Sequence, residues 1–118
     1  MRFFQSLRDA LRGLVYVFRT EQNFRLQTLG GAVALALAVI FQVPTWQAVF
    51  IIFLIAAVIT MELLNTALEH FTDLLKPRLH HYVMAIKDIM AAAVLVTSLG
   101  ALLIGLIIFI PYFIKLLG

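Results

Sequence analysis

The sequence predicts an all-α membrane protein with one domain, residues 1–118, in which an N-terminal interfacial helix precedes three transmembrane helices. Of its 118 residues, 64% are hydrophobic and only 13% are charged, and the mean hydropathy is +1.05. Soluble domains are about 45–50% apolar, and domains of this size bury only about 60–70% of their surface. The excess apolar surface therefore has to face lipid. The absence of cysteine excludes disulfides and thiolate metal sites.

The first expected helix covers residues 2–20, where apolar and basic residues recur on different faces. Phe3, Leu7 and Leu11 follow helical spacing, while Arg8 and Arg12 point elsewhere. This pattern is typical of a helix lying in the membrane interface with its basic residues at the lipid headgroups. An amphipathic helix packed on the bundle is a compatible alternative. Charges every few positions argue against a cleavable signal peptide.

Two transmembrane spans are expected next, because no residue between Leu26 and Met61 is charged. One crossing needs about 20 apolar residues, so this run is too long for one helix and suits two. Pro44 disfavours helix at the residue before it and predicts a turn within residues 41–47. We therefore expect spans at about 24–41 and about 46–70.

A polar break containing Pro77 is expected to end the second span, and a third span is expected at about 89–110, with Pro111 and Lys115 at its far end. Eight of the nine Lys and Arg residues lie in the N-terminal segment, residues 2–25, or within 76–88, and none lies in the first turn. Basic loops stay on the cytoplasmic side. The N-terminus is therefore expected in the cytoplasm and the C-terminus outside.

Four polar side chains fall on one face of the second expected span, near its cytoplasmic end. At about 100° per residue, Glu62, Asn65, Glu69 and Asp73 lie within an arc of about 80°. We call this set the polar stripe. Each charged group costs about 2.5–3.5 kcal/mol at mid-membrane, and aligned carboxylates repel one another.

The polar stripe therefore predicts compensating cations. The candidates are Lys87, Arg78, Arg25 and a bound metal ion, and carboxylate oxygens suit Mg²⁺. The simpler alternative is a solvated helix end, with Glu69 and Asp73 in the cytosol and Glu62 paired structurally.

Two shorter patches can reach the same interface. Glu21 and Arg25 lie four residues apart just before the first span, where an ordinary helical ion pair is the simpler interpretation. Lys87 and Asp88 lie where the third span begins, and there an acidic residue is also favoured by the helix dipole. The sequence has no glycine-rich phosphate-binding loop, and we do not expect a nucleic acid partner.

The chain resembles the small bacterial membrane lipid kinases, which comprise the prokaryotic diacylglycerol kinases and the undecaprenol kinases. The resemblance extends over nearly the whole chain and rests on four stretches, "EQNFR", "ELLNTALEHFTDLL", "LHHYVMAIKD" and "AAAVL". It implies a homotrimeric bundle in the bacterial inner membrane, with active sites formed between subunits at the cytoplasmic face. It also implies ATP as co-substrate, Mg²⁺ as cofactor and a membrane lipid as acceptor.

The resemblance also implies a role for individual residues. By position, Glu62 is similar to the family's proposed catalytic base, and Glu21 and Glu69 match its metal-bridging carboxylates. The residues that match nucleotide-binding positions are Glu21, Asn65, Glu69, Asp73, His80, Lys87 and Asp88. Those that match lipid-substrate positions are Asn23, Phe24, Arg25, Leu26, Gln27, Glu62 and Ala91.

These residue types suit phosphoryl transfer at a membrane surface, which depends mainly on positioning and charge neutralisation. Lys87 is expected to neutralise phosphate charge, and Glu62 to take the proton of the lipid hydroxyl. The acceptor can be diacylglycerol or undecaprenol. The alternative function is that of a non-enzymatic small membrane protein, an assembly or channel-like oligomer that uses the polar stripe for subunit contacts.

Overall fold

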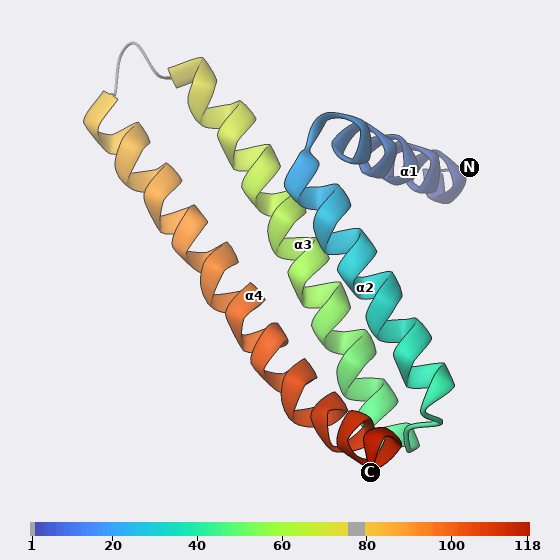
Figure 1. Ribbon diagram of the computed structural model, residues 1–118. Helices are drawn as coiled ribbons and strands as arrows, with labels where there is room; N and C mark the ends of the chain where they lie inside the picture. The colour runs from blue at the N-terminus through green and yellow to red at the C-terminus, as the bar shows by residue number, and fades with distance from the viewer. Residues whose placement is uncertain (1, 76–79) are drawn as a thin grey trace.

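The computed structural model describes residues 2–75 and 80–118, without the side chain of His80. These residues form four helices and no strand, namely α1 (Arg2–Thr20), α2 (Gln22–Ile40), α3 (Thr45–Leu75) and α4 (His80–Leu117). Helices α2, α3 and α4 run alongside one another, and α1 lies across one end of them (Figure 1). α2, α3 and α4 are each long and apolar enough to cross a membrane. The predicted all-α membrane fold, with one N-terminal helix and three spanning helices, is confirmed.

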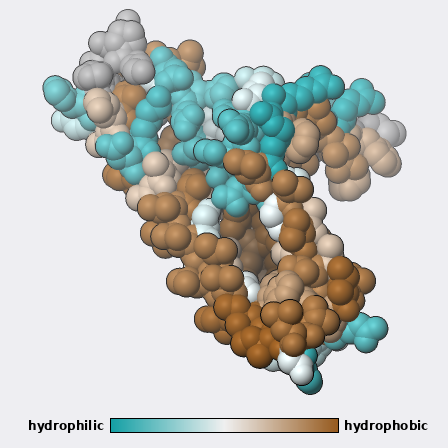
Figure 2. Space-filling view, in the orientation of Figure 1, coloured by the Kyte–Doolittle hydropathy of each residue, from teal (hydrophilic) through white to brown (hydrophobic). Residues whose placement is uncertain are grey.

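The surface divides into a polar end and an apolar belt. Hydrophilic residues gather at the end that carries α1, and hydrophobic residues cover most of the remaining length of the bundle (Figure 2). In α1 itself only Val17 is buried, while Phe3 and Phe4 are 72% and 67% exposed. A helix with exposed aromatic residues beside basic ones suits the boundary between lipid and water.

Contacts at the C-terminal half of α1 fix this helix to the bundle. The Tyr16 hydroxyl lies 2.9 Å from Nε2 of His70 on α3, and Nδ1 of His70 lies 2.9 Å from the Thr66 carbonyl oxygen. Because that carbonyl can only accept, Nδ1 carries a proton, and in the neutral ring Nε2 accepts from Tyr16. The two rings also meet edge to face. These contacts set the angle at which α1 leaves the bundle.

The turn between α2 and α3 closes α2 with a Schellman motif. The Val43 N–H donates to the Ala38 carbonyl and the Gln42 N–H to the Val39 carbonyl, both at 3.2 Å. Gln42 has a φ of 50°, the left-handed conformation that this motif requires and that glycine adopts most easily. The turn predicted from Pro44 is therefore stabilised mainly by backbone hydrogen bonds.

Aromatic residues close the bundle at the end opposite α1. The ring of Phe41 stacks on Tyr112 at 5.3 Å between centroids and meets Phe113 edge to face at 5.0 Å. Phe109 lies beside them, and the Tyr112 hydroxyl donates to the Gln47 side-chain oxygen at 2.7 Å. Residues from the turn after α2, from α3 and from α4 thus meet at this end.

The helices and the expected spans differ in their limits. Pro111 was expected at the far end of the third span, but it lies inside α4, which continues to Leu117. The last turns of α4 pack in the aromatic cluster through Tyr112 and Phe113, and this packing explains why the helix does not end at the proline. The expectation that Pro77 ends the second helix lies outside the described residues. The limits of the membrane-embedded segments remain predictions.

Candidate functional site

The polar stripe on α3 passes from buried to exposed along the helix. Glu62 is only 5% exposed, Asn65 and Glu69 are half-buried, and Asp73 is exposed. The Asn65 side-chain amide donates to the Glu69 carboxylate at 3.0 Å, as their spacing of four residues allows. One helix therefore presents carboxylates at graded depths from the apolar interior to the polar end.

Glu21 reaches the same place from another segment. It is the single residue between α1 and α2 and has an extended backbone, with φ −114° and ψ 115°. It occupies the N-cap position of α2, yet its side chain makes no capping hydrogen bond. Instead, both its carboxylate and that of Glu69 interact electrostatically with Glu62. The three glutamates of the chain, which are all that the sequence contains, therefore converge.

This convergence is unfavourable for the protein alone. Like charges at short range repel, and the repulsion grows where water is excluded, as it is around buried Glu62. No basic side chain forms an ion pair with Glu21, Glu62 or Glu69 among residues 2–75 and 81–118. The geometry therefore favours an external cation at this place.

Gln27 connects the site to α4. Its side-chain amide donates to the Ser98 hydroxyl at 3.2 Å, and the same side chain hydrogen-bonds to Glu62. Gln27 is the last residue but one of the polar start of α2, and Ser98 follows Thr97 in the apolar middle of α4. A polar junction of three helices therefore holds the buried carboxylate in place.

Lys87 brings positive charge to the exposed part of the polar stripe. Its ammonium group donates to the Asp73 carboxylate at 2.8 Å and interacts electrostatically with Glu69. Its side chain remains 30% exposed. A lysine held this way can turn toward an incoming anion without leaving a buried charge unpaired.

The structure divides the residues expected to contact lipid. Phe24 is buried and Gln27 points inward, whereas Asn23 and Leu26 are exposed on the outside of α2. Arg25 was considered for an ion pair with Glu21, but its guanidinium instead donates to the Phe18 and Arg19 carbonyls at the end of α1. Those carbonyls lack partners within their own helix and carry partial negative charge, so they attract the cation.

Three further residues matched from the family lie on α4. Ala91 and Asp88 are exposed, and no hydrogen bond or ion pair of Asp88 occurs among the described side chains. The side chain of His80 lies outside the described part of the chain. The structure therefore brings Glu21, Glu62 and Glu69 together, with Lys87 beside Glu69, and leaves Asp88 and Ala91 at the surface.

Two polar contacts were missed from the sequence. Ser98 was not singled out, although polar side chains within an apolar span, here Thr97 and Ser98, are a recognisable signal for a contact between helices. The link between Tyr16 and His70 carried no such signal, because both residues also suit an interface without touching.

The described residues contain no group of three or more His, Asp or Glu side chains arranged to hold a metal ion. Glu21 and Glu69 each interact electrostatically with Glu62, and the Asn65 amide donates to the Glu69 carboxylate. Magnesium is usually bound by one or two carboxylates together with water and substrate phosphates. This donor set suits Mg²⁺ that arrives with a phosphate ligand.

Comparison with known proteins identifies relatives over most of the chain. Residues 8–109 match the family described as prokaryotic diacylglycerol kinase. An undecaprenol kinase of Bacillus subtilis is 36% identical over 110 residues, which cover 93% of this chain and 89% of that kinase. A diacylglycerol kinase of Synechocystis sp. is 32% identical over 113 residues, covering 95% of this chain and 65% of the relative. No solved structure matches.

Proposed function

Since the chain belongs to the prokaryotic diacylglycerol kinase family and is a lipid kinase, we propose that it transfers the γ-phosphate of ATP to the primary hydroxyl of a membrane lipid, with Mg²⁺ as cofactor. The acceptor is a lipid alcohol of the kind named for its relatives, diacylglycerol or undecaprenol. The kinase assignment replaces the non-enzymatic alternative.

One observation carries this proposal. Glu62, which directly follows the uncharged run 26–61 on α3, interacts electrostatically with Glu69 further along α3 and with Glu21 between α1 and α2, so all three glutamates of the sequence gather where the apolar run ends. ATP comes from water, whereas the acceptor hydroxyl stays at the headgroup plane. A catalyst that joins them needs its charged groups at this boundary.

Glu21 and Glu69 would hold Mg²⁺, with Asn65 orienting the Glu69 carboxylate through its 3.0 Å hydrogen bond. When bound, the ion offsets the negative charge of the transferring phosphoryl group. Lys87 supplies a second positive charge, and Asp73 keeps it near the site. In phosphoryl transfer such positioning and charge neutralisation provide most of the catalysis.

Glu62 takes the proton from the lipid hydroxyl. As its carboxylate accepts that proton, the hydroxyl oxygen bonds to the γ-phosphorus, the bond from this phosphorus to the β-phosphate oxygen breaks, and ADP leaves. Gln27 holds the Glu62 side chain from one side, so the carboxylate keeps one orientation. General base catalysis of this type contributes about 10²–10⁴-fold in rate.

We propose a location in the bacterial inner membrane with the N-terminus in the cytoplasm. The clustering of basic residues at the α1 end supports this orientation. We also propose a homotrimer, on the resemblance to the family alone. Its neighbouring copies would approach the polar end and provide further contacts to the nucleotide.

The function is tested by labelled phosphate transfer. The purified full-length chain, reconstituted in bilayers, receives ATP labelled at the γ-phosphate and either diacylglycerol or undecaprenol. We expect Mg²⁺-dependent label in one lipid product. ATP hydrolysis that leaves both lipids unlabelled would contradict the proposal.

A further inference from the structure

The three long helices line an open cavity of about 340 Å³ next to the candidate site. Hydrocarbon side chains dominate its walls, and it opens as a recess in the apolar belt (Figure 2). Ligand pockets usually measure about 300–1,000 Å³. The cavity is therefore large enough for a substrate group.

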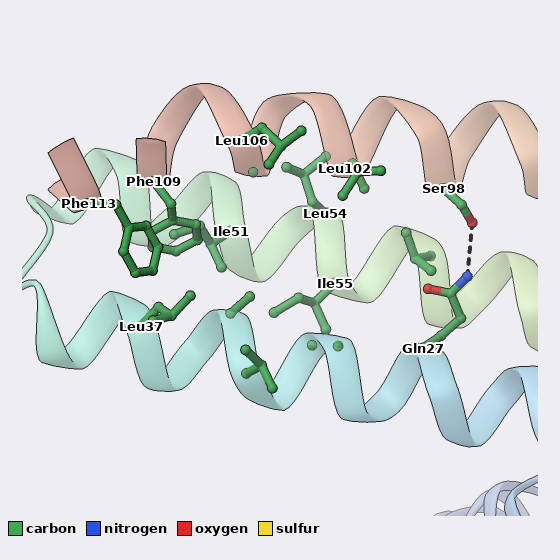
Figure 3. A pocket seen from close by; sticks show the side chains of 17 residues that line it. Gln27, Leu37, Ile51, Leu54, Ile55, Ser98, Leu102, Leu106, Phe109 and Phe113 are labelled. Carbon is green, nitrogen blue, oxygen red and sulfur yellow. Dashed lines mark hydrogen bonds between the residues drawn. The ribbon is translucent and has the colours of Figure 1, made fainter. Parts of the chain in front are cut away.

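The two ends of the cavity differ in chemistry. Gln27 and Ser98 line the end nearer α1, and Phe109 and Phe113 line the other (Figure 3). Because Gln27 also hydrogen-bonds to Glu62, the polar end is continuous with the candidate catalytic carboxylate. A lipid with its hydroxyl at Glu62 would extend its chain toward the aromatic end.

Two glycines leave space open in the cavity walls. A Cβ atom at Gly30 or Gly105 would meet no atom within 4 Å, although both residues line the cavity. Gly31 differs, because its Cβ would lie 3.0 Å from Ile55, so this glycine serves the close packing of α2 on α3. Helix packing therefore does not account for glycine at positions 30 and 105.

The volume limits what can enter. An apolar protein cavity of about 150 Å³ holds one benzene molecule, so 340 Å³ corresponds to roughly two such groups end to end. This suits a segment of one hydrocarbon chain and not two chains side by side.

We propose that this cavity receives one hydrocarbon chain of the acceptor, a long-chain primary alcohol, and that Gly30 and Gly105 determine which chains fit. This inference rests on the proposed lipid phosphorylation. With a rise of 1.5 Å per residue, Gly30 lies about 4.5 Å below Gln27, and Gly105 lies about 10 Å below Ser98. Gly30 therefore controls entry, and Gly105 controls the deeper part of the chain.

The test compares Gly105→Leu with Gly100→Leu. Gly100 lies on the same helix and also has open space at its Cβ position, but it does not line the cavity. Both substitutions raise helix propensity equally. Each purified full-length variant is assayed in bilayers with a series of primary alcohols of increasing chain length, and with polyprenol and diacylglycerol as separate acceptors.

For Gly105→Leu we expect at least a tenfold higher KM for long-chain alcohols, and an unchanged KM for ATP and for alcohols too short to reach position 105. Gly30→Leu should raise the KM for short and long alcohols alike. Gly105→Ala should raise the KM for long alcohols less than Gly105→Leu does. Gly100→Leu should leave the KM for both short and long alcohols unchanged. The same rise in KM for Gly105→Leu is expected with whichever of polyprenol and diacylglycerol the wild type phosphorylates.

Equal kinetics for Gly105→Leu and Gly100→Leu, or a penalty independent of chain length, would overturn the inference. A wild-type protein that labels no lipid would contradict the proposed function instead. Chain binding is then measured without nucleotide as the rise in melting temperature caused by the long-chain alcohol. We expect this rise in melting temperature for wild type and Gly100→Leu but not for Gly105→Leu. Absence of the rise in wild type would also contradict the inference.

Discussion

Arg25, in the first turn of α2, donates a hydrogen bond from its guanidinium to the Phe18 carbonyl oxygen of α1 at 2.8 Å. A second bond at 3.1 Å reaches the Arg19 carbonyl. Glu21 lies at the corner between the two helices, so the bonds of Arg25 link the two helices that flank this glutamate.

Removal of this contact is expected to loosen α1. Arg25→Ala should lower the free energy of unfolding by about 1 kcal/mol, less than the roughly 1.5–3 kcal/mol of hydrogen bonds to charged groups because Arg25 is exposed, and reduce kinase activity through Glu21. Hydrogen exchange of residues 2–20 measures the loosening. Arg12→Ala is the control, because Arg12 pairs with Asp9 at 3.6 Å on an exposed face of α1. Equal exchange in both variants would refute the role of Arg25.

Glu62→Gln should abolish turnover and preserve nucleotide binding. The amide keeps the shape of the buried side chain but cannot take a proton, so kcat should fall by about 10²–10⁴-fold. Calorimetry of nucleotide binding provides the control, and we expect affinity within about threefold of wild type. A variant with near-normal kcat would show that Glu62 is not the base.

A charge swap can distinguish the binding of ATP by Lys87 from its ion pair with Asp73. Lys87→Met should raise the KM for ATP at least tenfold, because the phosphates lose a cation. The double variant Lys87→Asp with Asp73→Lys can rebuild the ion pair between α3 and α4 but moves the positive charge away. We expect it to regain melting temperature without regaining affinity for ATP. If ATP affinity returned with the bridge, Lys87 would have only a structural role.

Chelation of Mg²⁺ should stop phosphate transfer, and Glu21→Gln and Glu69→Gln should each raise the Mg²⁺ concentration required for half-maximal rate. The physical reason is the loss of one carboxylate ligand from a site that has few. Asp9→Asn is the matched control, since Asp9 is an exposed acid on α1 away from the site. The same Mg²⁺ requirement in all three variants would exclude the two glutamates as ligands.

The turn at Gln42 offers a test of stability alone. Gln42→Gly should raise the free energy of unfolding by about 1 kcal/mol, because a non-glycine residue is unfavourable in the left-handed conformation. Gln42→Val should lower it, since β-branched residues tolerate a positive φ least. Thermal unfolding in detergent provides the measurement. Similar melting temperatures for the two variants would show that this conformation does not limit stability.

Helix content, the first turn and the polar stripe could be predicted because each depends on local pattern. The uncharged run from Leu26 to Met61 predicted two spanning helices. Helical spacing placed Glu62, Asn65 and Glu69 on one face. The partner of Arg25 could not be predicted, because spacing alone favours Glu21 four residues away. Its actual partners are backbone carbonyls, whose availability depends on where α1 ends.

The cavity could not be predicted either. Gly30 and Gly105 lie on different helices, and their spacing in sequence says nothing about which empty volumes they share. That α4 continues past Pro111 to Leu117 was likewise not evident from the sequence, and there Tyr112 and Phe113 pack on Phe41. The cavity and the end of α4 both depend on contacts between residues far apart in the sequence.

The aromatic cluster around Phe41 and Tyr112 has a consequence for the path by which a lipid enters and leaves the protein. Because it fills the end of the bundle opposite α1, we expect that a hydrocarbon chain bound in the proposed cavity does not pass lengthwise between the two sides of the membrane. On that proposal, acceptor and phosphorylated product would exchange sideways through the recess between the helices and stay in the same leaflet. Turnover is then expected to depend on lateral diffusion within that leaflet and not on flipping of the lipid.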